Sequence, residues 1–132
     1  MTAQPIVNSL DFARLQPLLT GGFVDAAVLR LRAFLDQARK VAPRRVPPDV
    51  VTMNSRVTLA SVDGHRQVVT LAYPQEASAE RGRVSVLAPL GRALLGARVG
   101  ELVRVEVPGA APRELRVAGI EYQPESAGDF EL

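Results

Sequence analysis

The sequence predicts an α+β protein: a short N-terminal antiparallel helical hairpin, followed by an antiparallel β-sheet domain with one short helix. Two observations support this class. Apolar residues recur every three or four positions as far as Ala42, and at every second position from Arg56 onward. Between the two patterns, residues 43–48 contain three prolines, which cannot continue a helix. We therefore predict a helical hairpin over residues 1–46 and a sheet domain over residues 47–132.

The first helix is predicted from Phe12, Leu15 and Leu19, which share one helical face. Asn8 or Ser9 is expected to cap its N-terminus. Pro17 removes a backbone donor and crowds the preceding turn, so the helix should be short, kinked or split at residues 16–17.

The second helix is predicted over about residues 24–40, which gives it a length of roughly 25 Å at 1.5 Å per residue. Its apolar seam consists of Val24, Val28, Leu31, Leu35, Ala38 and Ala42. Two amphipathic helices joined by so short a loop should fold back on each other, with a tip that includes Gly21, Gly22, Phe23 and Asp25. The pattern leaves open whether this hairpin projects from the sheet domain or packs on it.

Five strands are predicted over residues 56–60, 66–73, 83–87, 102–107 and 114–122. The dipeptide Asp63-Gly64 is a strong hairpin-turn signal, and His65 beside it is expected at the surface. A short helix over residues 90–95 should begin at Pro89 and end at Gly96. The C-terminal tail is expected to be extended, or to fold back on the domain through Tyr122 and Phe130.

Composition excludes several classes of function. The 132 residues include no cysteine and one histidine, so neither a disulfide framework nor a thiolate metal site can form. No phosphate-binding glycine loop or nucleophile motif is found, and we expect no catalytic residue, metal or cofactor. The net charge is only +2, and aromatic residues make up 5% with no tryptophan, which argues against direct sequence-specific binding of nucleic acid. The absence of a signal peptide or long apolar run predicts a cytoplasmic protein that does not bind membranes, and we expect a monomer.

Three blocks of sequence, residues 51–57, 88–96 and 121–129, resemble the Rnk-type regulators of nucleoside diphosphate kinase. These are relatives of the transcript-cleavage factors GreA and GreB and share their C-terminal domain. The resemblance runs from about Asn8 to the C-terminus. It implies an FKBP-like fold for the sheet domain and a non-enzymatic bacterial transcription regulator, whose partner is RNA polymerase near the secondary channel.

The resemblance also implies a docking surface at the short helix: Ala88, Pro89, Gly91 and Arg92, with Gly91 and Arg92 expected to point outward and Leu90, Leu94 and Leu95 to point into the core. Gre factors commonly carry serine where this chain has Ala88. A basic cluster that includes Arg44 and Arg45 is most simply explained as a solvated surface, and contact with an acidic partner surface or phosphate is the alternative.

Gre factors stimulate transcript cleavage by delivering acidic side chains at the hairpin tip to a magnesium ion in the polymerase. Here the tip offers one carboxylate, Asp25, on helices shorter than those of the Gre factors. We therefore expect a protein that competes with Gre-type factors without stimulating cleavage. Two alternatives stay open: a peptidyl-prolyl isomerase, suggested by the FKBP-like topology alone, and an adaptor for a partner other than polymerase.

Overall fold

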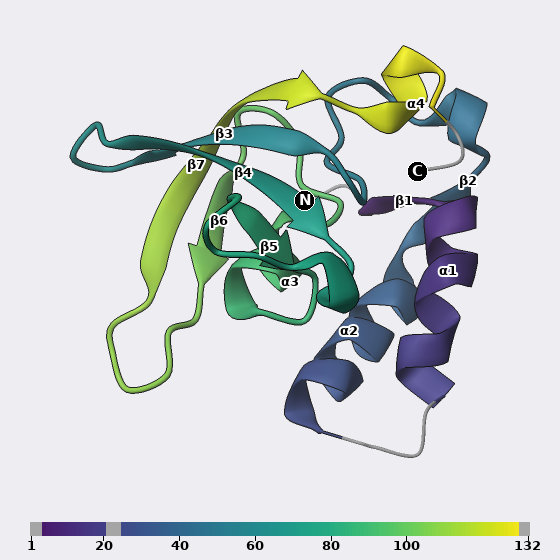
Figure 1. The fold of residues 1–132 in the computed structure, drawn as a ribbon, viewed down its shortest axis with the longest axis horizontal. Helices are drawn as coiled ribbons and strands as arrows, with labels where there is room; N and C mark the ends of the chain where they lie inside the picture. Colours follow the sequence, from purple (N-terminus) through teal and green to yellow (C-terminus); the bar gives the residue numbers. More distant parts are fainter. Residues whose placement is uncertain (1–3, 21–24, 130–132) are drawn as a thin grey trace.

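The computed structural model describes residues 4–20 and 25–129 and confirms the α+β class. Two helices lie beside a curled sheet that carries one short helix (Figure 1). The elements, with η for 3₁₀ turns, are β1 (Ile6–Asn8), α1 (Ser9–Thr20), α2 (Ala26–Gln37), β2 (Arg39–Val41), η1 (Pro43–Arg45), β3 (Arg56–Ser61), β4 (Arg66–Ala72), η2 (Pro74–Glu76), β5 (Arg83–Ser85), α3 (Pro89–Leu94), β6 (Leu102–Val105), β7 (Arg113–Tyr122) and α4 (Pro124–Ala127). None of the helices in the described residues is long and apolar enough to cross a membrane.

The main sheet contains all five predicted strands in the order β5-β4-β3-β7-β6. Its pairings are antiparallel except that of β4 with β5, which is parallel, so the sheet is mixed. The β3–β4 turn lies where Asp63-Gly64 predicts it: Gly64 has φ +89°, and His65 is exposed. A left-handed backbone of this kind favours glycine.

The first helix begins as expected but is not split. The Asn8 side chain accepts a hydrogen bond from the Leu10 N–H at 2.8 Å, and α1 then continues through Pro17 to Thr20. Of the three forms expected for this helix, short, kinked or split, the split at residues 16–17 is not found. Pro17 has no N–H to donate to the carbonyl of Ala13, four residues earlier. Both residues are exposed, so water can donate a hydrogen bond to that carbonyl.

The second helix is shorter than predicted. Val28, Leu31, Leu35 and Ala38 are buried as the seam requires, but α2 ends at Gln37 and Ala42 is exposed. Residues 39–41 instead form β2, which pairs in parallel with β1, and the Arg39 N–H donates to the Pro5 carbonyl at 2.8 Å. A partner strand more than 30 positions away in the sequence thus overrides the helical periodicity.

The hairpin packs on the sheet domain. One continuous cluster of buried apolar side chains joins the helices, through residues such as Leu15, Leu31 and Leu35, to the sheet, through residues such as Leu59 and Val117. Figure 1 shows the two helices alongside the sheet domain. Of the two arrangements that the sequence left open, the structure shows the packed one.

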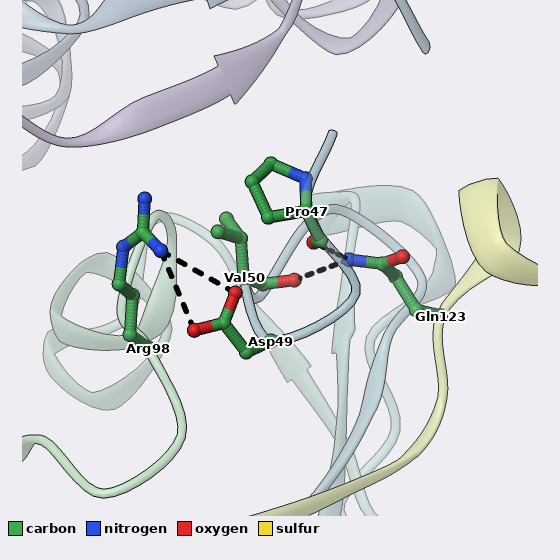
Figure 2. Close-up of polar contacts among 5 residues, drawn as sticks. All are labelled: Pro47, Asp49, Val50, Arg98 and Gln123. Atoms are coloured by element: carbon green, nitrogen blue, oxygen red, sulfur yellow. Dashed lines mark hydrogen bonds and ion pairs between the residues drawn. The ribbon is translucent and has the colours of Figure 1, made fainter. Parts of the chain in front are cut away.

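Two side chains, those of Gln123 and Arg98, fix the proline-rich segment that connects the hairpin to the sheet (Figure 2). The buried Gln123 amide donates to the Pro47 carbonyl at 2.8 Å and to the Val50 carbonyl at 2.7 Å. Arg98 and Asp49 form an ion pair at 3.4 Å. The connection is therefore held to the end of β7 on one side and to the loop after α3 on the other.

The C-terminal segment folds back on the domain, which is the second of the two arrangements expected for it; Phe130 lies outside the described residues. Pro124 begins the short helix α4, which ends at Ala127 and is followed by Gly128 with φ +78°. The Tyr122 hydroxyl then donates a hydrogen bond to the Asp129 carboxylate. Proline at the first helical position and glycine just beyond the last are ordinary signals for the start and the end of a helix. Here they enclose a helix of a single turn.

Candidate functional site

The predicted docking segment forms α3 and the residues on either side of it. Ala88 caps the helix without a side-chain hydrogen bond, and Pro89 occupies a first-turn position where a missing N–H costs nothing. Leu94 and Leu95 are buried as predicted, and Leu90 is half-buried against the same core. The short helix is therefore anchored from beneath by its leucines.

Gly91 does not point outward as predicted. It is buried, and a Cβ added at this position would lie 1.9 Å from the carbonyl oxygen of Ser85. Real Cβ atoms do not approach a backbone atom so closely, so only glycine fits here. Gly91 thus lets α3 lie directly against the chain leaving β5, and it offers no side chain to a partner.

Arg92 is partly exposed, in agreement with the prediction. Its guanidinium donates to the Leu87 carbonyl. Burial lowers the pKa of Arg92, the nearby Arg30 lowers it further, and Asp25 opposes this shift. Since Arg30 and Asp25 belong to the start of α2, the tip end of the hairpin lies close to α3.

A shallow concavity of about 510 Å³ opens between α2, α3 and β6. Its described lining consists of Arg30, Pro89, Arg92, Ala93, Arg104 and Glu106. Three guanidinium groups face one carboxylate, so the hollow is electropositive. Two of the predicted docking residues, Pro89 and Arg92, thus belong to a surface suited to an acidic partner.

The hairpin tip is only partly described: Gly21, Gly22 and Phe23 lie outside the described residues. Asp25 is exposed and caps α2, with its carboxylate accepting the Val28 N–H at 2.9 Å. This is a common structural role for aspartate at a helix N-terminus. Among residues 4–20 and 25–129, no group of three or more acidic, histidine or cysteine side chains is arranged to hold a metal ion.

Arg44 and Arg45 are exposed on η1, which packs against α4. Because α4 and α3 lie at well-separated places in Figure 1, the structure does not bring these arginines next to Pro89 and Arg92. The two candidate contact regions are therefore distinct surfaces.

The three blocks that carry the resemblance meet at residues 51–55. The N–H of Val51 donates to the Ala97 carbonyl at 2.8 Å, and the Val51 carbonyl accepts the Gly96 N–H at 2.9 Å. The Thr52 hydroxyl donates to Glu125 at 2.7 Å. Much of what these blocks share is thus explained by their packing on one another.

Asp11 is a buried acid whose position the sequence did not predict. Its carboxylate accepts the Met53 N–H at 3.1 Å and so joins α1 to the first block. Burial raises the pKa of Asp11 from 3.8 to about 7; Glu125 adds to this shift, while the Met53 N–H and Arg14 oppose it. Asn8, which donates to Glu125, completes the polar contact between hairpin and sheet domain. In the sequence, Asp11 looks like an ordinary acid in the first turn of a helix, and nothing there indicates that it is buried.

Comparison with known proteins places these features in a family. Residues 46–122 match the family described as transcription elongation factor GreA/GreB, C-terminal. The regulator of nucleoside diphosphate kinase from Escherichia coli strain K12 is 44% identical over 133 residues, covering 96% of each protein. GreA from Syntrophomonas wolfei is 33% identical over 87 residues, which cover 65% of this chain and 55% of GreA.

The solved structures agree. A prokaryotic transcription elongation factor GreA/GreB from Nitrosomonas europaea has a TM-score of 0.77 at 34% identity, and the match covers 92% of this chain and 100% of that one. A GreA-like arrangement of two N-terminal helices and a curled sheet therefore accounts for nearly the whole molecule. The chain belongs to the GreA/GreB family and is a homologue of the regulator of nucleoside diphosphate kinase.

Proposed function

We propose that this protein is a transcription regulator that binds RNA polymerase near its secondary channel and competes with Gre-type factors without stimulating transcript cleavage. The observation that carries the proposal is the surface at α3, where Pro89 and Arg92 border an electropositive hollow on a GreA/GreB-type domain. An acidic patch on the polymerase would complement this hollow.

The hairpin supports a role without catalysis. Its helices have 12 residues each, which corresponds to about 18 Å at 1.5 Å per residue. Metal-assisted cleavage needs several oxygen ligands at one point, whereas Asp25 is a single carboxylate occupied in capping α2. The hairpin also packs along the sheet domain, which limits how far it can reach into a channel.

A transcript-cleavage assay on backtracked elongation complexes tests this proposal. The protein alone should not accelerate cleavage, and in excess it should inhibit GreA-stimulated cleavage. Asp25→Ala should inhibit as well as the wild type. Leu94→Ala should lose inhibition, since the cavity left beneath α3 costs about 2–5 kcal/mol of stability.

Cleavage stimulation that depends on Asp25 would contradict the non-catalytic role. A complete lack of competition would instead favour an adaptor with another partner, the alternative from a different class.

The isomerase alternative has less support. Such activity requires an apolar pocket lined by aromatic side chains. In the sheet domain, Tyr73 is buried, with 8% of its surface exposed, and Tyr122 borders a pocket rich in arginine. A proline-isomerisation assay on a model peptide should show no rate above background.

A further inference from the structure

A second concavity, of about 510 Å³, lies on the solvent-facing side of the main sheet. It is formed by β3, β4, the segment from η2 to β5, and the end of β7, and no residue of α3 belongs to it. The volume falls within the range of roughly 300–1,000 Å³ typical of small-molecule sites. Neither the docking surface nor the family resemblance assigns it a role.

Strand register places four of its side chains in one row. Arg83 on β5 pairs with Thr70 on β4, Thr70 pairs with Arg56 on β3, and Arg56 pairs with Tyr122 on β7. Paired residues on neighbouring strands point to the same face of a sheet. Arg56 and Arg83 therefore flank Thr70 with their backbones about 10 Å apart, two strand spacings. Their side chains are long enough to converge on a ligand between them.

The described lining of this pocket carries a net positive charge. Arg56, Arg81 and Arg83 are all exposed, and none forms an ion pair or hydrogen bond with another side chain or carbonyl in the described part of the chain. Glu76 is the one acid among the described lining residues. Three unpaired guanidinium groups in one hollow repel each other, and an anion between them would relieve that repulsion.

The remaining lining favours a compact polar ligand. Thr70 offers a hydroxyl on the floor, and the ring of Tyr122 is held in place by the hydrogen bond from its hydroxyl to Asp129. At the rim, Asn54 has φ +67° and Gly82 has φ +68°, and the Gly82 carbonyl accepts the Thr70 N–H at 2.8 Å. The hydrogen bonds of Tyr122 and Thr70 hold the walls of the pocket in place, so the arginine side chains extend from a backbone that is already formed.

We propose that this pocket binds a diphosphate group, free or carried by a nucleoside. Guanidinium groups bind phosphate oxygens through paired hydrogen bonds, and two linked phosphates offer enough oxygens to engage Arg56 and Arg83 at once. Arg81 covers the open side and Thr70 donates from the floor. The site does not depend on polymerase docking, because its residues lie outside the α3 surface.

Isothermal titration calorimetry of the full chain with inorganic pyrophosphate at about 0.15 M salt tests the site under screened conditions. Saturable binding to one site is expected. Arg56→Gln and Arg83→Gln should each weaken it by about tenfold or more. Arg66→Gln is the matched control, because Arg66 is exposed on the same strand and face as Thr70 but lies outside the pocket. Unchanged melting temperatures for all three variants would show that the fold is intact.

A second titration with a nucleoside diphosphate identifies the form of the ligand. Tighter binding than pyrophosphate, with the same dependence on Arg56 and Arg83, supports a nucleotide; equal binding supports the diphosphate group alone. The proposal is overturned if neither ligand binds, if Arg66→Gln weakens binding as much as the pocket variants, or if an acidic peptide binds and pyrophosphate does not.

Discussion

Asp11 joins the hairpin to the sheet domain through a hydrogen bond from the Met53 N–H to its carboxylate. Burial holds the pKa of its carboxyl at about 7, whereas an unfolded chain would have the ordinary value of 3.8. The folded state therefore keeps this proton between about pH 4 and pH 7 while the unfolded state releases it. The stabilisation is complete below pH 4 and is lost as the pH rises to 7, by an amount on the order of 4 kcal/mol.

Asp11→Asn should remove this pH dependence. Asparagine can still accept the Met53 N–H through its carbonyl but carries no charge to bury. The variant should be more stable than the wild type at both pH 5 and pH 8, and by a larger margin at pH 8, as measured by urea unfolding at both values. Asp36→Asn, at an exposed position on α2, is the control and should change the stability at neither pH. A variant that is less stable than the wild type at pH 8 would contradict the assignment.

Some single residues were predictable and others were not. Asp25 at the start of α2 and Pro89 at the start of α3 follow from local preferences, which depend on near neighbours alone. The inward position of Gly91 depends on the Ser85 carbonyl, which only the tertiary fold brings close. The burial of Asp11 depends in the same way on residues far along the chain.

The helix α3 should be sensitive to any side chain at Gly91. Gly91→Ala would place its Cβ 1.9 Å from the Ser85 oxygen and force α3 away from β5. We expect a loss of about 1–3 kcal/mol or more in the free energy of unfolding, together with loss of polymerase binding. Gly119→Ala is the control, because nothing lies within 4 Å of the added atom and its φ is not positive. Equal stability of the two variants would show that α3 does not pack as described.

The basic turn η1 provides a separate test of charge. Reversing Arg44 and Arg45 to Glu should weaken or slow association with an acidic partner while changing the melting temperature little, because exposed charges contribute little to folding. Association rates measured across a range of salt concentrations would show the effect. Rates that match the wild type at every salt concentration would assign these arginines to an ordinary solvated surface.

At the level of elements, the five strands and α3 were predicted because alternation and turn residues act locally. The end of α2 was not, because the apolar spacing continues to Ala42 while β1 offers residues 39–41 a strand partner. The turn of α4 was missed for a related reason: four residues give no periodicity, and this helix packs against η1.

For the whole molecule, the division at residues 46 and 47 remains a prediction. A fragment of residues 47–132 contains every strand of the main sheet and should unfold cooperatively. It should nevertheless be several kcal/mol less stable than the full chain, because it loses the packing of Leu15, Leu31 and Leu35 on the shared core. Near-UV circular dichroism and urea unfolding would measure both properties. A fragment without fixed tertiary signals would show that the hairpin is part of a single folding unit.

The candidate site was predictable only in part. The resemblance of residues 88–96 predicted a docking surface at α3, and Pro89 and Arg92 do line a surface hollow. The contributions of Arg30 and Arg104 could not be predicted, since they come from α2 and β6 and meet α3 only in the packed fold. The arginine row across the sheet likewise depends on strand register, which hydrophobic alternation alone does not fix.

Competitive binding to RNA polymerase tests the central claim most directly. The fluorescently labelled protein should bind core polymerase, and unlabelled GreA should displace it fully. Arg92→Glu should weaken binding by about tenfold or more, while Arg66→Glu, on a different part of the surface, should bind as the wild type does. Simultaneous binding of both proteins, or unchanged affinity of a folded Arg92→Glu variant, would contradict docking through α3.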